Sequence, residues 1–255
     1  MFIDTHCHLT DELCDAGELD AIVARAANAG VGALICPGAD AADAAKQIEI
    51  INKYEKVFAT LGIHPERANQ NADVGAILPD DLFAHPKVLG VGEIGLDYHY
   101  GAEFKKQQIE LFERQLDLAQ RHHLPVAIHT RDADEDTARI LDDAGVGGVM
   151  HCFTGSWDFA KKMLDRGFFF SAGGILTFKN AAELRDVFAK IPNDRIVIET
   201  DSPYLAPVPY RGKKCEPFMV VETAITMAGI KKLRLDQMED ILMQNTKKLY
   251  PRIKL

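Results

Sequence analysis

The sequence predicts an α/β fold: a (β/α)8 TIM barrel in a single domain, residues 1–255, with an additional C-terminal helix. Short apolar or β-branched runs alternate with longer amphipathic segments almost to the end of the chain, a pattern typical of a parallel sheet with crossover helices. The length of 255 residues suits a closed barrel, which needs about 250 residues. A G-x-G-x-x-G turn after the first strand would favour a dinucleotide-binding sheet, and the sequence has none there.

Eight short apolar runs are expected to form the strands. They are Met1–His6, Gly32–Cys36, Val57–Ile63, Val88–Ile94, Pro125–His129, Gly148–His151, Phe168–Ser171 and Arg195–Thr200. Each run is separated from the next by a segment long enough for a crossover. We therefore expect parallel strands whose carboxyl ends meet at one rim of the barrel.

Seven amphipathic stretches are expected to form helices. They are Leu19–Ala29, Ala42–Lys53, Phe104–His122, Glu135–Ala144, Asp158–Arg166, Ala181–Lys190 and Leu235–Leu249. Gly30, Gly145 and Gly167 stand where a helix should end and a strand begin, as expected for C-terminal caps. The last of these helices, Leu235–Leu249, should pack on the outside of the barrel.

Composition and charge exclude several classes of protein. No apolar run reaches the ~20 residues of a membrane span, and no signal peptide is visible. The formal net charge of −9 argues against a protein that holds duplex DNA by bulk electrostatics. Five cysteines without a C-x-x-C pair (Cys7, Cys14, Cys36, Cys152 and Cys215) favour thiols in the cytoplasm. Because no exposed heptad or apolar strip stands out, we expect a monomer.

Polar residues of the types that bind metals stand at or near the ends of the expected strands. They are His6, His8, His64, Glu93, His129, His151, Glu199 and Asp201. A lone histidine after a strand is usually structural, and a lone carboxylate there can close a turn. Five of the nine histidines at strand ends, however, favour one shared site at the rim that carries barrel active sites.

The types and spacing of these residues predict a metal site. His6 and His8 are two residues apart, so their side chains should point to the same side of an extended segment. Paired imidazoles suit a borderline divalent cation such as Zn²⁺. Carboxylates would neutralise the charge of the cation. Because four histidines and two carboxylates exceed the ligands that one tetrahedral site needs, we expect two metal ions. Cys7 alternates away from the histidines and is expected to pack in the core.

Motifs with recognisable order and spacing extend from Asp4 to Tyr250: DTHCHL, GIHP, GEIGLDY, HTRDA, HCFTGS, GGILTFKNA, ETDSPYLAP, YRGKKCEP and NTKKLY. Together they resemble those of the TatD family of metal-dependent deoxyribonucleases. The resemblance implies a barrel that holds two, or sometimes three, divalent cations, with Zn²⁺, Mn²⁺ and Mg²⁺ all accepted by such ligands. The implied metal ligands are His6, His8, Glu93, His129, His151 and Asp201, with Glu93 bridging.

The resemblance also implies hydrolysis of phosphodiester bonds by a water that two metal ions activate. We expect a 3′–5′ exonuclease at the ends of single-stranded DNA, and endonuclease action and an RNA substrate stay open as alternatives. The implied catalytic residues are Asp201, Glu93 and His64. Asp201 would orient the water and accept its proton. The implied substrate contacts are His64, Arg131, Arg211 and Lys213. A histidine in a turn before Pro65, and a solvated basic loop at 211–214, are the structural alternatives for these positions.

One position departs from the family pattern. Cys215 stands where the family commonly has asparagine in the stretch R-G-K-R-N-E-P. A thiol is a poor replacement for an amide as a hydrogen-bond donor. Since Arg211, Lys213 and Glu216 remain, we expect an altered loop rather than a lost one.

Two other functions stay open at this point. A metal-dependent esterase or deacylase, acting on another nucleic-acid-linked or small-molecule bond, would use the same cations. Its cyclic-amide version is weakened because Glu93 stands where related barrels bridge their metals through a modified lysine. A catalytically idle barrel that serves as a binding partner would usually have lost ligands, whereas this chain retains all six.

Overall fold

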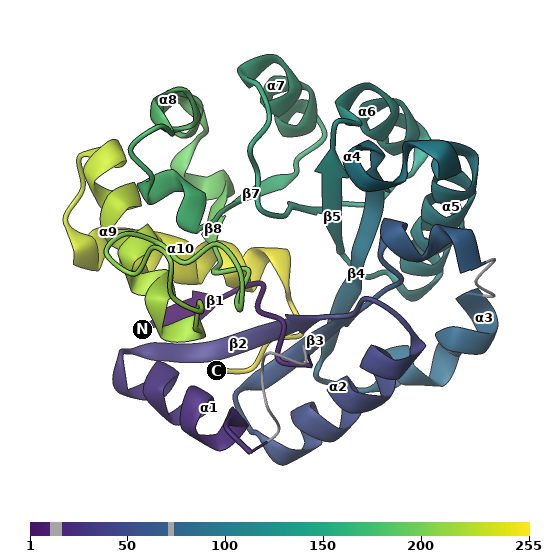
Figure 1. Cartoon of the computed structure of the whole chain (residues 1–255), viewed down its shortest axis with the longest axis horizontal. Coiled ribbons are helices and arrows are strands. Elements are labelled where there is room, and N and C mark those ends of the chain that lie inside the picture. The colour runs from purple at the N-terminus through teal and green to yellow at the C-terminus, as the bar shows by residue number, and fades with distance from the viewer. Residues whose placement is uncertain (11–16, 71–73) are drawn as a thin grey trace.

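The strands of the computed structural model, which describes residues 1–10, 17–70 and 74–255, form one parallel sheet in the order β1-β2-β3-β4-β5-β6-β7-β8 (Figure 1). They are β1 (Phe2–Asp4), β2 (Val31–Pro37), β3 (Val57–Leu61), β4 (Val88–Asp97), β5 (Val126–Arg131), β6 (Gly148–Met150), β7 (Phe169–Ala172) and β8 (Ile196–Ile198). Backbone hydrogen bonds join the first strand to the last, from Thr5 N to Ile198 O at 3.1 Å and from Asp201 N to His6 O at 2.9 Å. The predicted (β/α)8 barrel is therefore confirmed. Cys14 lies outside the described residues.

Helices alternate with the strands and surround them (Figure 1). They are α1 (Leu19–Asn28), α2 (Ala41–Lys53), α3 (Val74–Ile77), α4 (Tyr98–Gly101), α5 (Lys105–His122), α6 (Asp134–Asp143), α7 (Trp157–Asp165), α8 (Ala182–Lys190), α9 (Val220–Lys231) and α10 (Leu235–Leu249). The seven predicted helices begin and end within one residue of these bounds. Among the described helices, none has the length and apolar character needed to cross a lipid bilayer.

Helix α9 is a clear omission from the sequence prediction. Its sequence, VVETAITMAGIK, is apolar or small over most of its surface, so it lacks the periodic polar face that identifies an amphipathic helix. In the structure Val220, Ala224 and Met227 are buried, and α9 packs against α8, α10 and β1. Helix α10, which packs on α9, β1 and β8, occupies the predicted place outside the barrel.

The glycines expected to end helices have the backbone conformation that this role requires. Gly30, Gly145 and Gly167 follow α1, α6 and α7 with φ angles of 84°, 60° and 78°. This left-handed region is unfavourable for residues with a Cβ atom and open to glycine. The three predicted caps are confirmed.

Strands β1 and β8 end two residues earlier than predicted, and a buried side chain explains why. Asp4 is fully buried at the end of β1. Its carboxylate accepts hydrogen bonds from Thr200 N at 2.9 Å, from Thr200 Oγ1 at 2.6 Å and from His6 N at 3.3 Å. Because buried backbone N–H groups must be paired, this carboxylate replaces strand partners where the ladder stops.

Strand β4 runs to Asp97, three residues beyond the predicted end at Ile94. Gly95 pairs with His129 and Asp97 pairs with Arg131 on β5. Gly95 has a φ of 139°, and a side chain there would overlap the carbonyl oxygen of His129. The two strands can approach this closely because residue 95 is glycine. As a result Asp97, rather than Glu93, occupies the end of β4.

The inward-facing side chains change from apolar to polar along the barrel. One apolar cluster takes residues from all eight strands: Ile3, Ala33, Ile35, Phe58, Leu89, Ala127, Val149, Phe169 and Val197. Two residues further along most strands, and therefore on the same face, the side chains are polar. These are Thr5, Thr60, His129, His151, Ser171 and Glu199. The strand period thus places a polar layer at the carboxyl rim above an apolar one.

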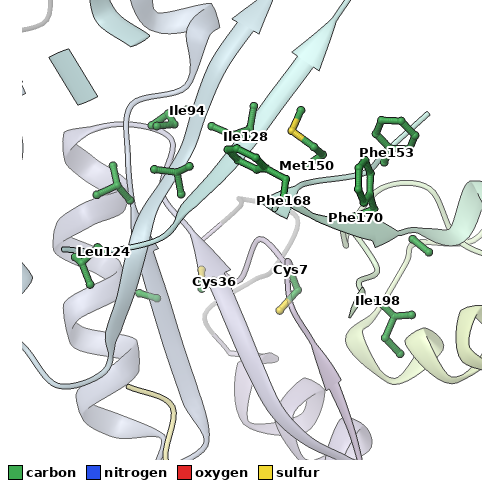
Figure 2. Packing of buried hydrophobic residues seen from close by; sticks show 14 of the residues in the cluster. Cys7, Cys36, Ile94, Leu124, Ile128, Met150, Phe153, Phe168, Phe170 and Ile198 are labelled. Carbon is green, nitrogen blue, oxygen red and sulfur yellow. The ribbon is translucent and has the colours of Figure 1, made fainter. Parts of the chain in front are cut away.

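A second and larger apolar layer lies between the strands and the surrounding helices. Figure 2 shows Ile128, Met150, Phe168 and Phe170 in this layer. Cys7 is also part of it and is fully buried, which confirms its predicted packing role.

The chain that follows α10 covers the amino-terminal end of the barrel. Tyr250 and Ile253 join the inner apolar cluster, and Tyr250 is fully buried. Its hydroxyl has no hydrogen-bond partner among the described residues. The aromatic ring of Tyr250, rather than its hydroxyl, should therefore stabilise this end of the barrel.

Replacing Tyr250 tests this packing role. Tyr250→Ala should lower the free energy of unfolding by about 3–5 kcal/mol, because a buried aromatic ring leaves a cavity behind. Tyr250→Phe should change it by less than about 1 kcal/mol, since its hydroxyl loses no partner. Urea denaturation followed by circular dichroism measures both variants. Similar losses in the two variants would contradict the role given to the ring.

Candidate metal centre

Glu93 lies at the mouth of the barrel with its carboxylate surrounded by imidazoles. The residue is 3% exposed and projects from the interior of β4. Its Oε2 lies 3.1 Å from Nε2 of His6 and 3.8 Å from Nε2 of His8. Oδ1 of Asp201 lies 3.3 Å from Nε2 of His8 and 3.8 Å from Nε2 of His6. One group of metal-binding atoms therefore gathers on the Oε2 side of Glu93.

A second group faces the other carboxylate oxygen. Oε1 of Glu93 lies 2.9 Å from Nδ1 of His129, 3.1 Å from Nε2 of His151 and 3.4 Å from Nε2 of His64. These histidines come from β5, from the segment after β6 and from the segment after β3. The carboxylate of Glu93 thus separates two sets of donor atoms, as a bridging ligand between two cations must.

The histidine pair at the start of the chain adopts the arrangement expected from its spacing. Nε2 of His6 and Nε2 of His8 lie 3.3 Å apart, so both rings are on the same side of the segment after β1. Between them, Cys7 forms an isolated parallel bridge with Ser202. That bridge holds the two histidines beside the segment that carries Asp201.

Two carboxylates outside the predicted ligand set orient the histidines. Oδ2 of Asp97 lies 2.9 Å from Nε2 of His129. Oε1 of Glu199 lies 3.0 Å from Nδ1 of His151 and accepts a hydrogen bond from Cys152 N at 2.8 Å. A carboxylate that accepts the N–H of one ring nitrogen leaves the lone pair of the other nitrogen free for a metal. In both histidines that other nitrogen faces Glu93.

The sequence offered only a weak signal for these two carboxylates. Glu199 was visible as a polar residue at the end of an expected strand, but its neighbour Asp201 carries the family resemblance to a ligand. Asp97 lies in the part of β4 that the prediction omitted. The pairing with a particular imidazole nitrogen depends on contacts between different strands, which spacing along the chain does not encode.

The donor set fits divalent cations. A tetrahedral zinc site with bonds of about 2.0–2.1 Å holds its ligand atoms about 3.3 Å apart. The separations around Glu93, from 2.9 to 3.8 Å, bracket this value. Within the part of the chain that the structure describes, three groups offer one donor atom from each residue, with these atoms within 4.8 Å of one another: His6, Glu93 and His151; His6, His8 and Asp201; His64, Glu93 and His129.

The electrostatics of the site keep its central carboxylate ionised. Burial favours the neutral form of Glu93, but the surrounding imidazoles, His151 foremost, outweigh it and hold the pKa of Glu93 well below its ordinary value. Burial likewise disfavours the charged form of His151, but Glu199 and Glu93 outweigh it and raise the pKa of His151 well above its ordinary value. The mouth therefore stabilises negative charge on Glu93 and attracts positive charge around it.

Of the expected substrate contacts, His64 is part of this cluster, and Arg131 stands beside it at the rim. Arg131 stands at the end of β5 and lines a cavity of about 590 Å³ that also contacts His151 and Cys152. Its guanidinium carbon lies 4.7 Å from the centre of the Tyr100 ring. Arg131 is therefore an exposed side chain at the edge of the mouth, held by an aromatic ring.

The basic loop after β8 is also exposed and contacts aromatic rings. The guanidinium carbon of Arg211 lies 3.8 Å from the centre of the Phe178 ring, and Nζ of Lys213 lies 5.8 Å from that of Tyr210. In these positions both cations are open to a ligand at the mouth. The structure brings neither into the groups of donor atoms around Glu93.

The departure at Cys215 has a structural explanation. Cys215 is 1% exposed and packs with Ala206 and Met219 in a small apolar cluster under the loop. Its backbone N–H donates to Pro203 O at 3.0 Å, which ties the loop to the segment after Asp201. In this chain the position stabilises the loop by apolar packing and a backbone hydrogen bond.

An eight-stranded parallel barrel with a buried imidazole–carboxylate cluster at its carboxyl rim defines the class of metal-dependent hydrolases built on the TIM barrel. The family model described as TatD related DNase matches residues 3–251. The chain belongs to the TatD family. The match covers every strand but the first residue of β1, together with the described helices.

Relatives and solved structures agree over the whole chain. The uncharacterized metal-dependent hydrolase YabD of Bacillus subtilis (strain 168) is 40% identical over 253 residues, which cover 98% of this chain and 99% of YabD. The uncharacterized metal-dependent hydrolase YcfH of Escherichia coli (strain K12) is 37% identical and covers 97% of this chain and 95% of its own. The crystal structure of YJJV, a TatD homolog from Escherichia coli K12, has a TM-score of 0.92 at 31% identity, with 98% of each chain covered.

Metal removal should destabilise the protein if Glu93 bridges cations. Added Mn²⁺ or Zn²⁺ should raise the thermal midpoint of chelator-treated protein, since a ligand at a hundred times its Kd stabilises by about 2.7 kcal/mol. Glu93→Ala should lose most of this rise and of the bound metal. Differential scanning fluorimetry with elemental analysis measures both. Asp136→Ala, at an acidic residue that pairs with Lys105 on the rim, is the matched control. An unchanged metal response in Glu93→Ala would contradict the bridge.

The orienting role of Glu199 predicts a graded loss of metal affinity. Glu199→Ala should weaken metal binding about 10- to 100-fold, because the far nitrogen of His151 loses its acceptor. Glu199→Gln should lose less, since its amide oxygen can still accept that hydrogen bond. Competition with a fluorescent zinc chelator measures the affinities. Wild-type affinity in Glu199→Ala would show that His151 is oriented by other contacts.

Proposed function

We propose that this chain is a metal-dependent deoxyribonuclease that removes nucleotides from single-stranded DNA in the 3′–5′ direction. The observation that carries the proposal is the position of Glu93, whose two oxygens each face a separate set of donors. Sites with two metals suit in-line displacement at phosphorus, because one cation can serve the attacking oxygen and the other the leaving oxygen. The family description, TatD related DNase, supports the same chemistry.

The proposed ligands are His6, His8, Glu93, His129, His151 and Asp201, with Glu93 shared between two divalent cations. Zn²⁺, Mn²⁺ and Mg²⁺ all accept such donors. The proposal is for two cations, with a third as in some members of the family. When bound, such cations would supply a water of lowered pKa and positive charge beside the phosphoryl oxygens. We further propose one domain over residues 1–255 that acts as a monomer.

Asp201 is the proposed acceptor of the proton that the attacking water loses. Burial favours its neutral form, but the hydrogen bond from His8 and the neighbouring histidines outweigh it and lower the pKa of Asp201. Asp201 is therefore ionised near neutral pH and able to accept a proton. Its Oδ1 lies 3.3 Å from Nε2 of His8, which holds the carboxylate beside the proposed metal ligands.

His64 is the proposed donor to a phosphate oxygen or to the leaving group. Its Nδ1 accepts a hydrogen bond from Glu66 N at 3.3 Å, so the proton of the neutral ring belongs on Nε2. That Nε2 points into the mouth, 3.4 Å from Oε1 of Glu93. The turn before Pro65 thus orients the ring, and the structural and catalytic roles considered for His64 are compatible.

Arg211, Lys213 and Arg131 are the proposed contacts to substrate phosphates. All three side chains are exposed at the mouth side of the barrel, after β8 or at the end of β5. A chain of net charge −9 cannot attract DNA by its overall charge, so local cations must do so. Cys36, Cys152 and Cys215 are thiols rather than disulfides, which supports a reducing compartment such as the cytoplasm.

The proposal predicts Mn²⁺- or Mg²⁺-dependent shortening of 5′-labelled single-stranded DNA from its 3′ end. Glu93→Ala should lose about a hundredfold or more in rate, because the bridging carboxylate holds the cations that stabilise the transition state. Denaturing gels measure the products, and internal fragments would indicate endonuclease action instead. Equal rates in wild type and Glu93→Ala would exclude the site. Faster hydrolysis of carboxylic esters than of phosphodiesters would favour the esterase alternative.

A further inference from the structure

Two exposed aromatic side chains stand at the mouth of the barrel. Among the described residues, the large hydrophobic side chains that are exposed include two rings, Tyr100 at 62% and Tyr204 at 49%. Tyr100 lies in α4, directly after β4, and Tyr204 lies in the segment after β8. Because the eight strands follow one another around the barrel, β4 and β8 are on opposite sides of it. The metal centre therefore lies between the two tyrosines.

Both rings are fixed to the metal centre through their own backbone. Tyr204 N donates to Asp201 O at 3.0 Å, and its ring makes an edge contact with His8 at a centroid distance of 6.3 Å. Tyr100 N donates to Oδ1 of Asp97 at 2.9 Å, and the other oxygen of Asp97 lies 2.9 Å from Nε2 of His129. Each tyrosine is thus anchored to a carboxylate residue that also contacts a histidine of the cluster.

The Tyr100 ring is also oriented by its neighbours. Arg131 lies over it at 4.7 Å, and the His99 ring contacts its edge at 4.6 Å. Nδ1 of His99 in turn lies 3.1 Å from Oδ2 of Asp132. A guanidinium over an aromatic ring is a favourable pair, so Arg131 holds the ring in place while the ring stays exposed.

Charge at the mouth disfavours a long track for the DNA backbone. The cavity of about 590 Å³ beside His151 is lined by four acidic residues and by two basic ones, Lys105 and Arg131. The acidic residues are Asp132, Asp134, Glu135 and Asp136. A phosphate in this cavity would therefore meet more acidic than basic side chains, on a chain whose net charge is −9. Beside the phosphate contacts proposed for Arg131, Arg211 and Lys213, the bases of a single strand offer a second source of affinity, because they stack on aromatic side chains irrespective of sequence.

We propose that Tyr100 and Tyr204 stack on bases of the single strand, one on each side of the phosphodiester bond at the metal centre. The inference rests on the proposed function, since it identifies how the nucleic-acid substrate is held. It makes the two tyrosines positioning residues that set where the strand lies. Recognition of this kind depends on the bases and tolerates different sequences, because every base has a π-face on which a ring can stack.

The test compares binding of a base-bearing strand with binding of the same backbone without bases. The probes are fluorescent phosphorothioate oligothymidine, which resists cleavage, and a phosphorothioate strand of equal length made of abasic deoxyribose units. Fluorescence anisotropy with Mn²⁺-loaded protein gives the two Kd values. Wild type should prefer the base-bearing strand by roughly fivefold or more. The double variant Tyr100→Leu, Tyr204→Leu should lose this preference, and Tyr100→Phe, Tyr204→Phe should keep it.

Ile225→Ala, at an exposed apolar residue of α9, a helix that packs with α8 and α10, is the matched control and should bind as wild type does. A double leucine variant that still prefers the base-bearing strand, or a wild type without a preference, would overturn the inference. Because this readout is binding, it is separate from the cleavage assay. Failure of cleavage alone would overturn the proposed nuclease reaction and leave the stacking result to stand by itself.

Discussion

A buried carboxylate at the barrel mouth is the constraint on which the rest of the site depends. Glu93 is 3% exposed, and a charge at that depth is unfavourable unless cationic or hydrogen-bonding groups surround it. Imidazoles from four different strand ends supply those groups, on both oxygens of the carboxylate. The position of Glu93 therefore fixes where the ends of β1, β3, β5 and β6 must meet. A barrel that closed with another register would leave this charge without partners.

The two ends of the barrel have different physical roles. At the amino-terminal end, Tyr250 and the inner apolar cluster exclude water and contribute packing energy. At the carboxyl end the same inward positions carry Thr5, His129, His151 and Glu199. There Asp97 orients His129, and Glu199 orients His151. Side-chain alternation with a period of two makes this division possible, because each strand can be apolar at one end and polar at the other on one face.

The net charge of the chain, −9, does not favour the approach of the nucleic acid in the proposed function. For the proposed nuclease, an excess of acidic residues leaves local features of the mouth to hold the substrate: divalent cations on the donor set, the side chains of Arg131, Arg211 and Lys213, and the exposed rings of Tyr100 and Tyr204. Carboxylates such as Asp97 connect these features, since one oxygen of Asp97 contacts His129 and the other receives Tyr100 N–H. One residue, Asp97, therefore holds both a proposed metal ligand and a proposed substrate contact.

The sequence by itself determined the barrel, the bounds of seven helices to within one residue, and the set of polar residues that gather at the rim. These features depend on the local spacing of apolar and polar residues, which can be read from the sequence. Only the tertiary structure decided that Asp4 ends β1 and β8, that Asp97 and Glu199 orient His129 and His151, and which oxygen of Glu93 faces which histidine. Those features depend on contacts between residues that are far apart in the chain. The distances between these residues are set when the barrel closes.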